Sequence, residues 1–391
     1  MILQEKNSGN ESSFWLEMCP ATNFPILKTG LKVDVVILGG GIAGITTATL
    51  LKQAGYTVAV IEANRIIKDV TVGTTAKISV SPNKIYNNLI SHLGISKAKE
   101  YANTNSRALQ KISEIVEEYD IDCDFHRLPL YMFNESLEKV NELKQEFEAA
   151  KKLGLPVSWV EDVPLPFATG PAIKYDNQAQ FHPRKYLLAL SNELNGEGSY
   201  VFEKTRAITV KEGDVKKVIT DKGSIMADNV VIATHSPIYD PDGLHEYLHS
   251  ERSYVIGLYA RGKFPDGMFI DSFPVHTYRA TPTDNEKLII VAGEHSPVDV
   301  EDRNVYYHRL EKYANQHLNV ESFEYRWSSK DSVTDDGLPL IGMTSQEGIY
   351  VAAGFGFWGM TNGTTAAMVL TDLITGKKTS SIDLFNPLRF K

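Results

Sequence analysis

The pattern of apolar positions changes twice in the first part of the chain. Residues 33–38 are β-branched and almost wholly apolar, which is typical of a strand covered on both faces of a parallel sheet. Apolar residues then recur at helical spacing up to Gly55, at Ile45, Ala48, Leu51 and Ala54. A second buried strand is predicted over residues 57–61. Strand, helix and strand in this order predict a parallel βαβ unit.

The remainder of the chain mixes helical and strand-like stretches. Helical spacing predicts helices over residues 83–93, 96–119, 136–152, 183–194 and 306–317, and from residue 361 onward. Apolar runs between Gly-containing turns predict strands within residues 123–134, 199–235, 240–325 and 348–354. The stretch 156–171 is predicted to be a connection that crosses between domains, because it contains four prolines, Pro156, Pro164, Pro166 and Pro171.

Sheet-forming pieces near the start, middle and end of the chain predict a discontinuous nucleotide-binding domain. We assign it residues 32–95, 170–238 and 326–391. Residues 96–169 and 239–325 would form a substrate-binding domain, and residues 1–31 a polar tail and irregular arm. The predicted fold class is α/β, or α+β overall, with a Rossmann-like nucleotide-binding domain and an inserted substrate domain.

Three glycines join the first predicted strand to the first helix. Gly39, Gly41 and Gly44 form G-x-G-x-x-G, which allows a tight turn, close approach of a pyrophosphate, and packing of helix on strand. The helix N-terminus supplies unpaired N–H groups and partial positive charge for the phosphates. Glu62, after the second strand, suits hydrogen bonds from both ribose hydroxyls and disfavours a 2′-phosphate. The spacing predicts a bound dinucleotide, and its position near the start of a long chain favours FAD over NAD.

Composition limits the other classes of partner. The 391 residues carry a net charge of −9, which argues against nucleic acid and anionic membrane surfaces. No apolar run approaches the roughly 18 residues of a membrane span, and residues 1–31 lack the pattern of a signal peptide. Cys19 and Cys123 match no metal or redox spacing. We therefore expect no metal site, no disulfide-reductase chemistry and a cytoplasmic location.

A second glycine-rich turn occupies residues 352–367. A predicted strand leads into it, and a helix starts near Thr361. A tight strand–helix turn with core aromatic residues would account for this pattern without any ligand. The functional alternative is a helix N-terminus directed at the N1–C2 carbonyl edge of a flavin, where it would stabilise the negative charge of the reduced form.

These motifs, taken in order, resemble the FAD-dependent amino-acid oxidase family, which includes glycine, sarcosine and D-amino-acid oxidases. The likeness is strongest to flavoproteins that often carry a C-terminal Rieske iron–sulfur domain, whose paired Cys–His motifs this sequence lacks. The resemblance implies one FAD domain over an antiparallel sheet of the substrate domain. The motifs that carry it span nearly the whole chain: SFWLE (13–17), VDVVILGGGIAGITTATLL (33–51), VGTTAKIS (72–79), FHPRKYLLAL (181–190), VVIATH (230–235), AGEHS (292–296), YRWSSKD (325–331), DGLPLIG (336–342) and GFGFWGMTNGTTAA (354–367).

The resemblance also implies which residues contact FAD. The first glycine turn would hold the pyrophosphate, residues 74–77 would pass the ribityl group, and residues 356–361 would border the isoalloxazine. The segment 74–79 contains neither His nor Cys and the second turn contains no Cys, so we expect non-covalent FAD. The expected contacts are Gly39, Gly41, Ile42, Ala43, Gly44, Glu62, Ala63, Arg65, Thr74, Thr75, Ala76, Lys77, Ala207, Ala233, Thr234, Gly356, Phe357, Trp358, Gly359, Met360 and Thr361.

For the substrate, the resemblance implies an arginine on the sheet of the substrate domain, which would bind a carboxylate with two hydrogen bonds. Arg279, beside Tyr278, lies in the matching region, although it would otherwise pair with an acidic residue on the outer face. Lys77 would lie near flavin N5, or else would be a solvated loop lysine. Lys330 and Lys77 are the next candidates for a carboxylate anchor.

The sequence therefore predicts an FAD-dependent oxidoreductase of the amino-acid oxidase type. It would oxidise the C–N bond of a small amine or amino acid by hydride transfer to flavin N5. The alternative is an FAD electron-transfer module that works with an iron–sulfur or other redox partner protein and turns over no small amine.

Overall fold

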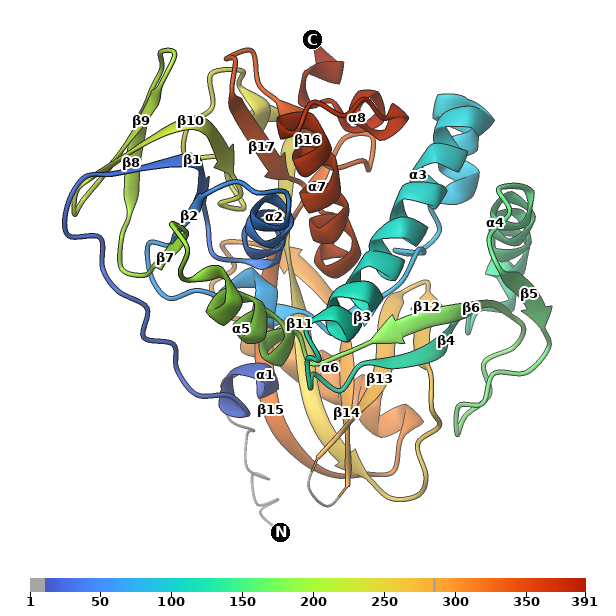
Figure 1. Cartoon of the computed structure of the whole chain (residues 1–391). Helices are drawn as coiled ribbons and strands as arrows, with labels where there is room; N and C mark the ends of the chain where they lie inside the picture. Colours follow the sequence, from blue (N-terminus) through green and yellow to red (C-terminus); the bar gives the residue numbers. More distant parts are fainter. Residues whose placement is uncertain (1–10, 284–285) are drawn as a thin grey trace.

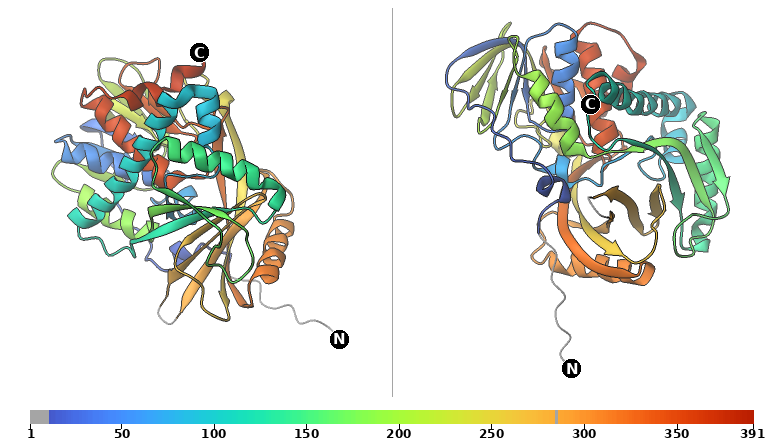
Figure 2. Two further views of the ribbon diagram at one scale, coloured as in Figure 1. Left: turned by 90° about the vertical axis from the view of Figure 1, so that its right-hand side faces the viewer. Right: turned by 60° about the horizontal axis from the view of Figure 1, so that its bottom comes forward.

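The computed structural model describes residues 11–283 and 286–391. Two β-sheets form its framework, and helices cover them on the outside (Figure 1). The helices α2 (Ile42–Gln53), α5 (Pro183–Leu194) and α7 (Gly359–Ile374) lie together over the first sheet. The helix α6 (Asn304–His317) covers the far face of the second sheet (Figure 2).

The first sheet contains the strands predicted for the βαβ unit. Its order is β16-β17-β10-β1-β2-β7, and the β8–β9 hairpin extends from β10. The pairs β10–β1, β1–β2, β2–β7 and β10–β17 are parallel. The strands are β1 (Leu31–Leu38), β2 (Val58–Ile61), β7 (Tyr200–Phe202), β8 (Ala207–Lys211), β9 (Lys216–Thr220), β10 (Ser224–Ile232), β16 (Leu340–Met343) and β17 (Ile349–Ala353).

Both faces of β1 are buried, as its continuous apolar run predicts. Val35 and Ile37 pack in one core with Leu51 of α2, whereas Val36 packs in a second core with Val218 of β9. The parallel register pairs the last residue of β1 with the last residues of β2 and β10. The three residues that follow these strands therefore emerge side by side at one edge of the sheet: Gly39, Glu62 and Ala233.

The second sheet is mostly antiparallel. Its order is β15-β11-β14-β13-β12-β4-β6-β3, with β5 paired to β6 and a parallel pair between β12 and β4. The strands are β3 (Lys77–Ile78), β4 (His126–Phe133), β5 (Val157–Val160), β6 (Ala172–Gln180), β11 (Leu248–Ala260), β12 (Met268–Ser272), β13 (Val275–Pro282), β14 (Lys287–Pro297) and β15 (Val320–Thr334).

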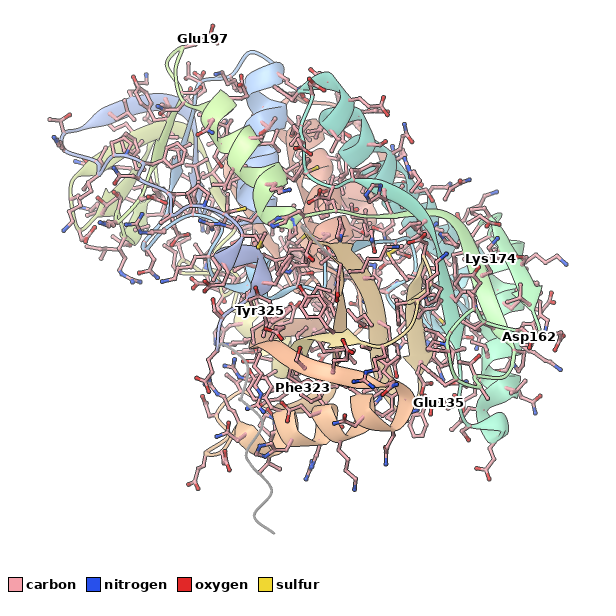
Figure 3. The ribbon with its side chains drawn as sticks, turned by 90° about the horizontal axis from the view of Figure 1, so that it is seen from below. Glu135, Asp162, Lys174, Glu197, Phe323 and Tyr325 are labelled. Atoms are coloured by element: carbon pink, nitrogen blue, oxygen red, sulfur yellow. The ribbon has the colours of Figure 1, made fainter. Side chains whose placement is uncertain are left out.

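Alternation along these strands decides which residues face the first sheet. Val255 of β11 belongs to the core shared with the first sheet, whereas its neighbour Tyr254 packs with α6 on the far face. Near the end of α6, the Tyr313 hydroxyl donates to Glu135 at 2.8 Å. Figure 3 labels Glu135 beside this part of the molecule. The far face is thus a separate core, closed by α6.

The remaining helices largely match their predicted ranges. The helices predicted over 83–93 and 96–119 form one element, α3 (Tyr86–Glu118), which is broken at Gly94, where φ is +79°. No helix in the described part of the chain is long and apolar enough to cross a membrane. The other helical elements are α1 (Phe14–Glu17), α4 (Val140–Lys152) and α8 (Ser380–Phe385), with short 3₁₀ turns at η1 (Val70–Gly73), η2 (Leu137–Lys139), η3 (Leu244–Tyr247) and η4 (Pro387–Phe390).

Three strands within the ranges predicted for the nucleotide-binding domain pair in the second sheet. Residues 32–95, 170–238 and 326–391 include β3, β6 and the end of β15, which belong to that sheet. An apolar run in the sequence indicates a strand without indicating its pairing partner. The first sheet nevertheless draws its strands from the start, middle and end of the chain.

The predicted irregular arm packs into the molecule. Residues 1–10, which belong to the predicted polar tail, lie outside the described residues. Trp15 of α1 is fully buried, and its indole N–H donates to the carbonyl oxygen of Thr74 at 2.8 Å. The Ser13 hydroxyl donates to the carbonyl oxygen of Val72 at 2.6 Å. The arm thus holds the segment that follows η1.

Candidate functional site

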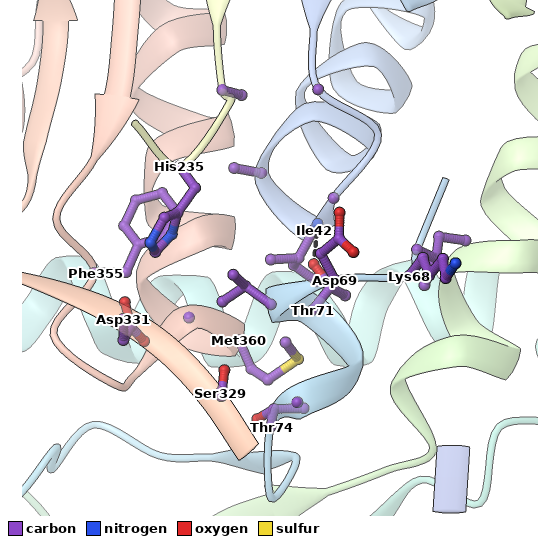
Figure 4. Close-up of a pocket in the computed structure, with 18 of the residues that line it drawn as sticks. Ile42, Lys68, Asp69, Thr71, Thr74, His235, Ser329, Asp331, Phe355 and Met360 are labelled. Atoms are coloured by element: carbon purple, nitrogen blue, oxygen red, sulfur yellow. Dashed lines mark hydrogen bonds between the residues drawn. The ribbon is translucent and has the colours of Figure 1, made fainter. Parts of the chain in front are cut away.

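A cavity of about 480 Å³ lies between the two sheets (Figure 4). The first sheet contributes the turn after β1, residues 61–71 and residues 233–235. The second sheet contributes residues of β11, β13, β14 and β15, and residues 355–360, where α7 begins, complete the wall. Open α/β sheets bind ligands beyond the carboxyl ends of their strands, and this cavity occupies that position.

The turn after β1 is shaped by backbone contacts that leave no room for side chains. Gly39 has a φ of +110°, and a Cβ there would lie 2.4 Å from the carbonyl oxygen of Ala233. A Cβ on Gly44 would lie 2.0 Å from the carbonyl oxygen of Gly39. Both glycines are therefore required for α2 to begin directly behind the turn. The N-terminus of α2 opens onto the cavity as a result, which suits an anion, and its first N–H, that of Ile42, donates to the Thr71 hydroxyl oxygen at 3.1 Å.

Glu62 lies at the end of β2, and backbone groups fix its carboxylate. Its Oε2 accepts from the N–H of Gly40 at 3.0 Å, and its Oε1 accepts from the N–H of Asn64 at 2.8 Å. Each carboxylate oxygen has a further lone pair that can accept from a ribose hydroxyl. Arg65 and Ala207 line the same end of the cavity.

The second glycine-rich turn brings the N-terminus of α7 to the same cavity. Gly356 and Phe357 both have left-handed backbone, with φ of +59° and +63°. The Trp358 indole N–H and the Thr361 hydroxyl donate to the carbonyl oxygen of Ser79, at 2.8 and 3.0 Å. These bonds tie the first turn of α7 to the chain that follows β3.

Most of the residues predicted to contact FAD line this cavity. Gly44, Ala76, Lys77 and Thr361 lie behind its wall, where Ala76 and Thr361 are fully buried. The predicted residues on the wall are Gly39, Gly41, Ile42, Ala43, Glu62, Ala63, Arg65, Thr74, Thr75, Ala207, Ala233, Thr234, Gly356, Phe357, Trp358, Gly359 and Met360.

Arg279, predicted to anchor a substrate carboxylate, lies inside the protein and not on the cavity wall. It is fully buried, and its Nη1 donates to the carbonyl oxygens of Thr75, Ala76 and Phe181 at 3.2, 3.0 and 3.2 Å. Its guanidinium carbon lies 5.3 Å from the ring centroid of Trp15. This placement does not support an anchoring role, because Nη1 is engaged by backbone acceptors and Arg279 is not among the residues that line the cavity.

Tyr278 and Lys330 occupy the wrong strand positions for contact with a ligand in this cavity. Tyr278 lies on the far face of β13, with its ring centroid 5.6 Å from that of Phe167. Ser329 and Asp331 line the cavity, whereas the intervening Lys330 is not on its wall; burial and then the nearby charge of Lys330 lower the pKa of His235, which is on the wall. Neither residue stands on the cavity wall, and the roles predicted for them need side chains that face it.

Lys77 is buried directly behind the wall. Its Nζ donates to the hydroxyl oxygens of Thr75 and Thr277 at 3.1 and 2.9 Å, and both threonines line the cavity. Burial, together with the nearby charge of Arg279, holds the pKa of Lys77 well below its usual value. The interpretation of Lys77 as a solvated loop lysine is therefore wrong, because its side chain is only 4% exposed.

Asp331 lines the cavity but was not among the predicted site residues. It is 7% exposed, and its Oδ1 accepts from the N–H of Ser332 at 2.8 Å. Burial raises the pKa of Asp331 to about 7 and lowers that of His235, which lines the same side of the cavity (Figure 4). The available signal was the alternation of Ser329 and Asp331, two polar residues on one face of a strand.

The residues around the cavity fit FAD. The two helix N-termini would serve an anionic pyrophosphate and an electron-rich flavin edge, and Glu62 would accept from a ribose. The glycine contacts described above let α2 begin directly behind the turn, so that its N-terminus reaches the pyrophosphate end of the cavity. These features define an oxidoreductase of the dinucleotide-binding flavoprotein class.

The chain belongs to the family described as "DAO: FAD dependent oxidoreductase", whose model matches residues 34–373. YhfW of Bacillus subtilis (strain 168), which carries the name of a Rieske 2Fe-2S iron-sulfur protein, is 35% identical over 97% of this chain and 75% of its own length. Gamma-glutamylputrescine oxidoreductase of Escherichia coli (strain K12) is 24% identical over 90% of this chain and 86% of its own.

Solved structures share the fold. Glycine oxidase from Geobacillus kaustophilus matches with a TM-score of 0.75 and 20% identity, over 92% of this chain and 99% of that one. L-proline dehydrogenase from P. horikoshii matches with a TM-score of 0.72 and 20% identity, over 92% and 98%. The predicted family resemblance, the FAD cofactor and the oxidoreductase class are confirmed.

Proposed function

We propose that this chain oxidises the C–N bond of an amine or amino acid by hydride transfer to N5 of FAD. The observation that carries this proposal is the single cavity onto which α2, α7 and the second sheet all open. The names glycine oxidase and gamma-glutamylputrescine oxidoreductase support amines or amino acids as the substrate class. FAD, when bound, would supply the hydride acceptor.

The protein would contribute binding, orientation and exclusion of water. The pyrophosphate would lie at the N-terminus of α2 and the adenosine ribose at Glu62. The isoalloxazine would lie at the N-terminus of α7, between Met360 and the inward face of the second sheet. Val255 and Ala292 give that face apolar positions that exclude water from the substrate.

Anaerobic reduction of the flavin tests the proposal. Purified protein would be mixed with a panel of amines and of D- and L-amino acids, and the visible absorbance of the oxidised flavin would be followed. We expect stoichiometric bleaching by at least one compound and the appearance of an imine or its hydrolysis product. A flavin that every compound in the panel leaves oxidised, but that dithionite reduces, would refute the proposal.

The N-terminus of α7 gives a second, independent test. Its dipole and N–H groups would stabilise the anionic reduced flavin by about 1–3 kcal/mol. We therefore expect a flavin potential above that of free FAD and formation of a sulfite adduct at N5. A potential equal to that of free FAD, with no sulfite adduct, would contradict this role for α7.

A second candidate function is electron transfer with an iron–sulfur partner protein, which the name of YhfW favours. In that case the flavin would be bleached by a reduced iron–sulfur protein and by none of the amines or amino acids. The same anaerobic experiment, repeated with a reduced ferredoxin as the donor, separates the two functions.

A further inference from the structure

Charged side chains are unevenly distributed around the cavity. The cationic residues on its wall, Arg65, Lys68 and Arg206, belong to the end near Glu62. Lys68 and Asp331 lie on opposite sides of the site (Figure 4). The second sheet places a carboxylate on the wall, that of Asp331, but no lysine or arginine among its described lining residues. The substrate side of the cavity is therefore acidic.

Among the residues that the structure describes, the carboxylate of Asp331 has no counter-ion. Within residues 11–283 and 286–391, no nitrogen of a lysine, arginine or histidine lies within 4.0 Å of its oxygens, although Asp331 is 7% exposed. A buried carboxylate is costly unless it is paired or protonated, and the pKa of Asp331, raised by burial to about 7, expresses that cost. A cationic ligand in the cavity would supply the missing charge.

A substrate carboxylate would find no cationic side chain among the described residues on this part of the cavity wall. The Arg279 guanidinium donates to three backbone carbonyl oxygens, and neither Arg279 nor Lys330 is among the residues that line the cavity. Lys77 lies behind Thr75 and Thr277, with its Nζ already donating to both hydroxyls. A carboxylate in this part of the cavity would face the like charge of Asp331, which is unfavourable.

We propose that Asp331 selects a substrate whose ammonium group binds its carboxylate, so that the enzyme prefers a cationic amine to a molecule with a free carboxylate at this position. This inference rests on the proposed function, because it names the substrate class of the same cavity. His235 and His295 are the other titratable residues lining this side, and His295 Nδ1 lies 3.4 Å from Glu251. These two histidines give the wall further polar groups for an amine.

Ligand binding to the FAD-loaded protein tests this inference without relying on turnover. The probes are n-butylammonium and butyrate, which have the same chain length and opposite charge. Each would be titrated anaerobically at constant ionic strength and pH 8, with binding followed by the flavin difference spectrum and by calorimetry. We expect n-butylammonium to bind at least tenfold more tightly than butyrate. Tighter binding of butyrate by the unmodified protein would overturn the proposal.

Two variants assign the preference to one residue. Asp331→Asn should weaken n-butylammonium about tenfold to a hundredfold, the usual effect of losing a charge-assisted hydrogen bond, and should leave butyrate unchanged or tighter. Asp335→Asn is the matched control, because Asp335 is an exposed aspartate just after β15 that pairs with His249. It makes the same change of charge outside the cavity and should leave both affinities unchanged.

The remaining outcomes are also decisive. If Asp331→Asn and Asp335→Asn have equal effects, the preference arises from general surface charge and the proposal fails. If butyrate binds more tightly and Lys77→Met removes that binding, Lys77 is the anchor and the substrate carries a carboxylate. Failure of the proposed function is distinguishable, because a protein that selects n-butylammonium through Asp331 but whose flavin no amine reduces would refute only the oxidation.

Discussion

Replacing Arg279 by methionine separates a structural role for this residue from a role in substrate binding. Methionine fills much of the same space but leaves three buried carbonyl oxygens without the donor that they have now. Each buried carbonyl oxygen left without a donor costs about 1–3 kcal/mol. Part of this total cost is offset because the variant no longer has to bury a charged guanidinium. We expect a net loss of about 3–5 kcal/mol in the free energy of unfolding.

The size of the protein sets the thermal shift that this loss produces. With about 2.1 cal/mol/K of unfolding entropy per residue, a chain of 391 residues has an unfolding entropy of about 0.8 kcal/mol/K. The expected destabilisation therefore lowers Tm by about 4–6 °C. Differential scanning calorimetry of FAD-loaded and FAD-free protein would measure it. Arg261→Met is the control, because Arg261 is 73% exposed and should change Tm by less than about 1 °C.

Ligand affinity is the second measurement on Arg279→Met. If Arg279 anchored a substrate carboxylate, the variant would keep its Tm and lose affinity for butyrate. A Tm within 1 °C of the unmodified protein, together with a large loss of butyrate affinity, would refute the structural assignment. We expect the opposite pair of results, a lowered Tm and an unchanged ratio of butyrate to n-butylammonium affinity.

Two further predictions follow from the glycine turn and from a buried carboxyl group. Gly39→Ala should purify with little FAD, because Gly39 has a φ of +110° and a Cβ there would lie 2.4 Å from a backbone oxygen. Gly30→Ala is the control: the atom nearest to its Cβ would be 3.9 Å away, and the variant should keep its full flavin absorbance per protein. Burial raises the pKa of Asp271 to about 7, so the folded state holds a proton that the unfolded state releases, and stability falls as the pH rises from about 4 to 7. Asp271→Asn should therefore raise stability by up to about 4 kcal/mol above pH 7, and an equal gain at pH 4 would contradict the reasoning.

Features whose residues are close together in the sequence could be predicted from it. The βαβ unit, the turn at Gly39 and the carboxylate of Glu62 lie within about 30 residues, and their spacing alone brings them to one edge of a parallel sheet. The second glycine turn was predictable for the same reason. In each case one strand delivers the chain to a turn, and the helix that follows must start there.

Which side chains face the substrate side of the cavity could be known only from the tertiary structure. Arg279 of β13 points into the interior because it packs against Thr75 and donates to its carbonyl oxygen, and Thr75 lies about 200 residues earlier in the chain. The pleat of β15 places Asp331 but not Lys330 on the cavity wall, and Lys77 of β3 is bonded to Thr277 of β13, a distant strand of the same sheet. Sequence pattern gives the alternation along a strand, but the pairing and packing of distant strands determine which face meets a ligand and which side chains are already engaged.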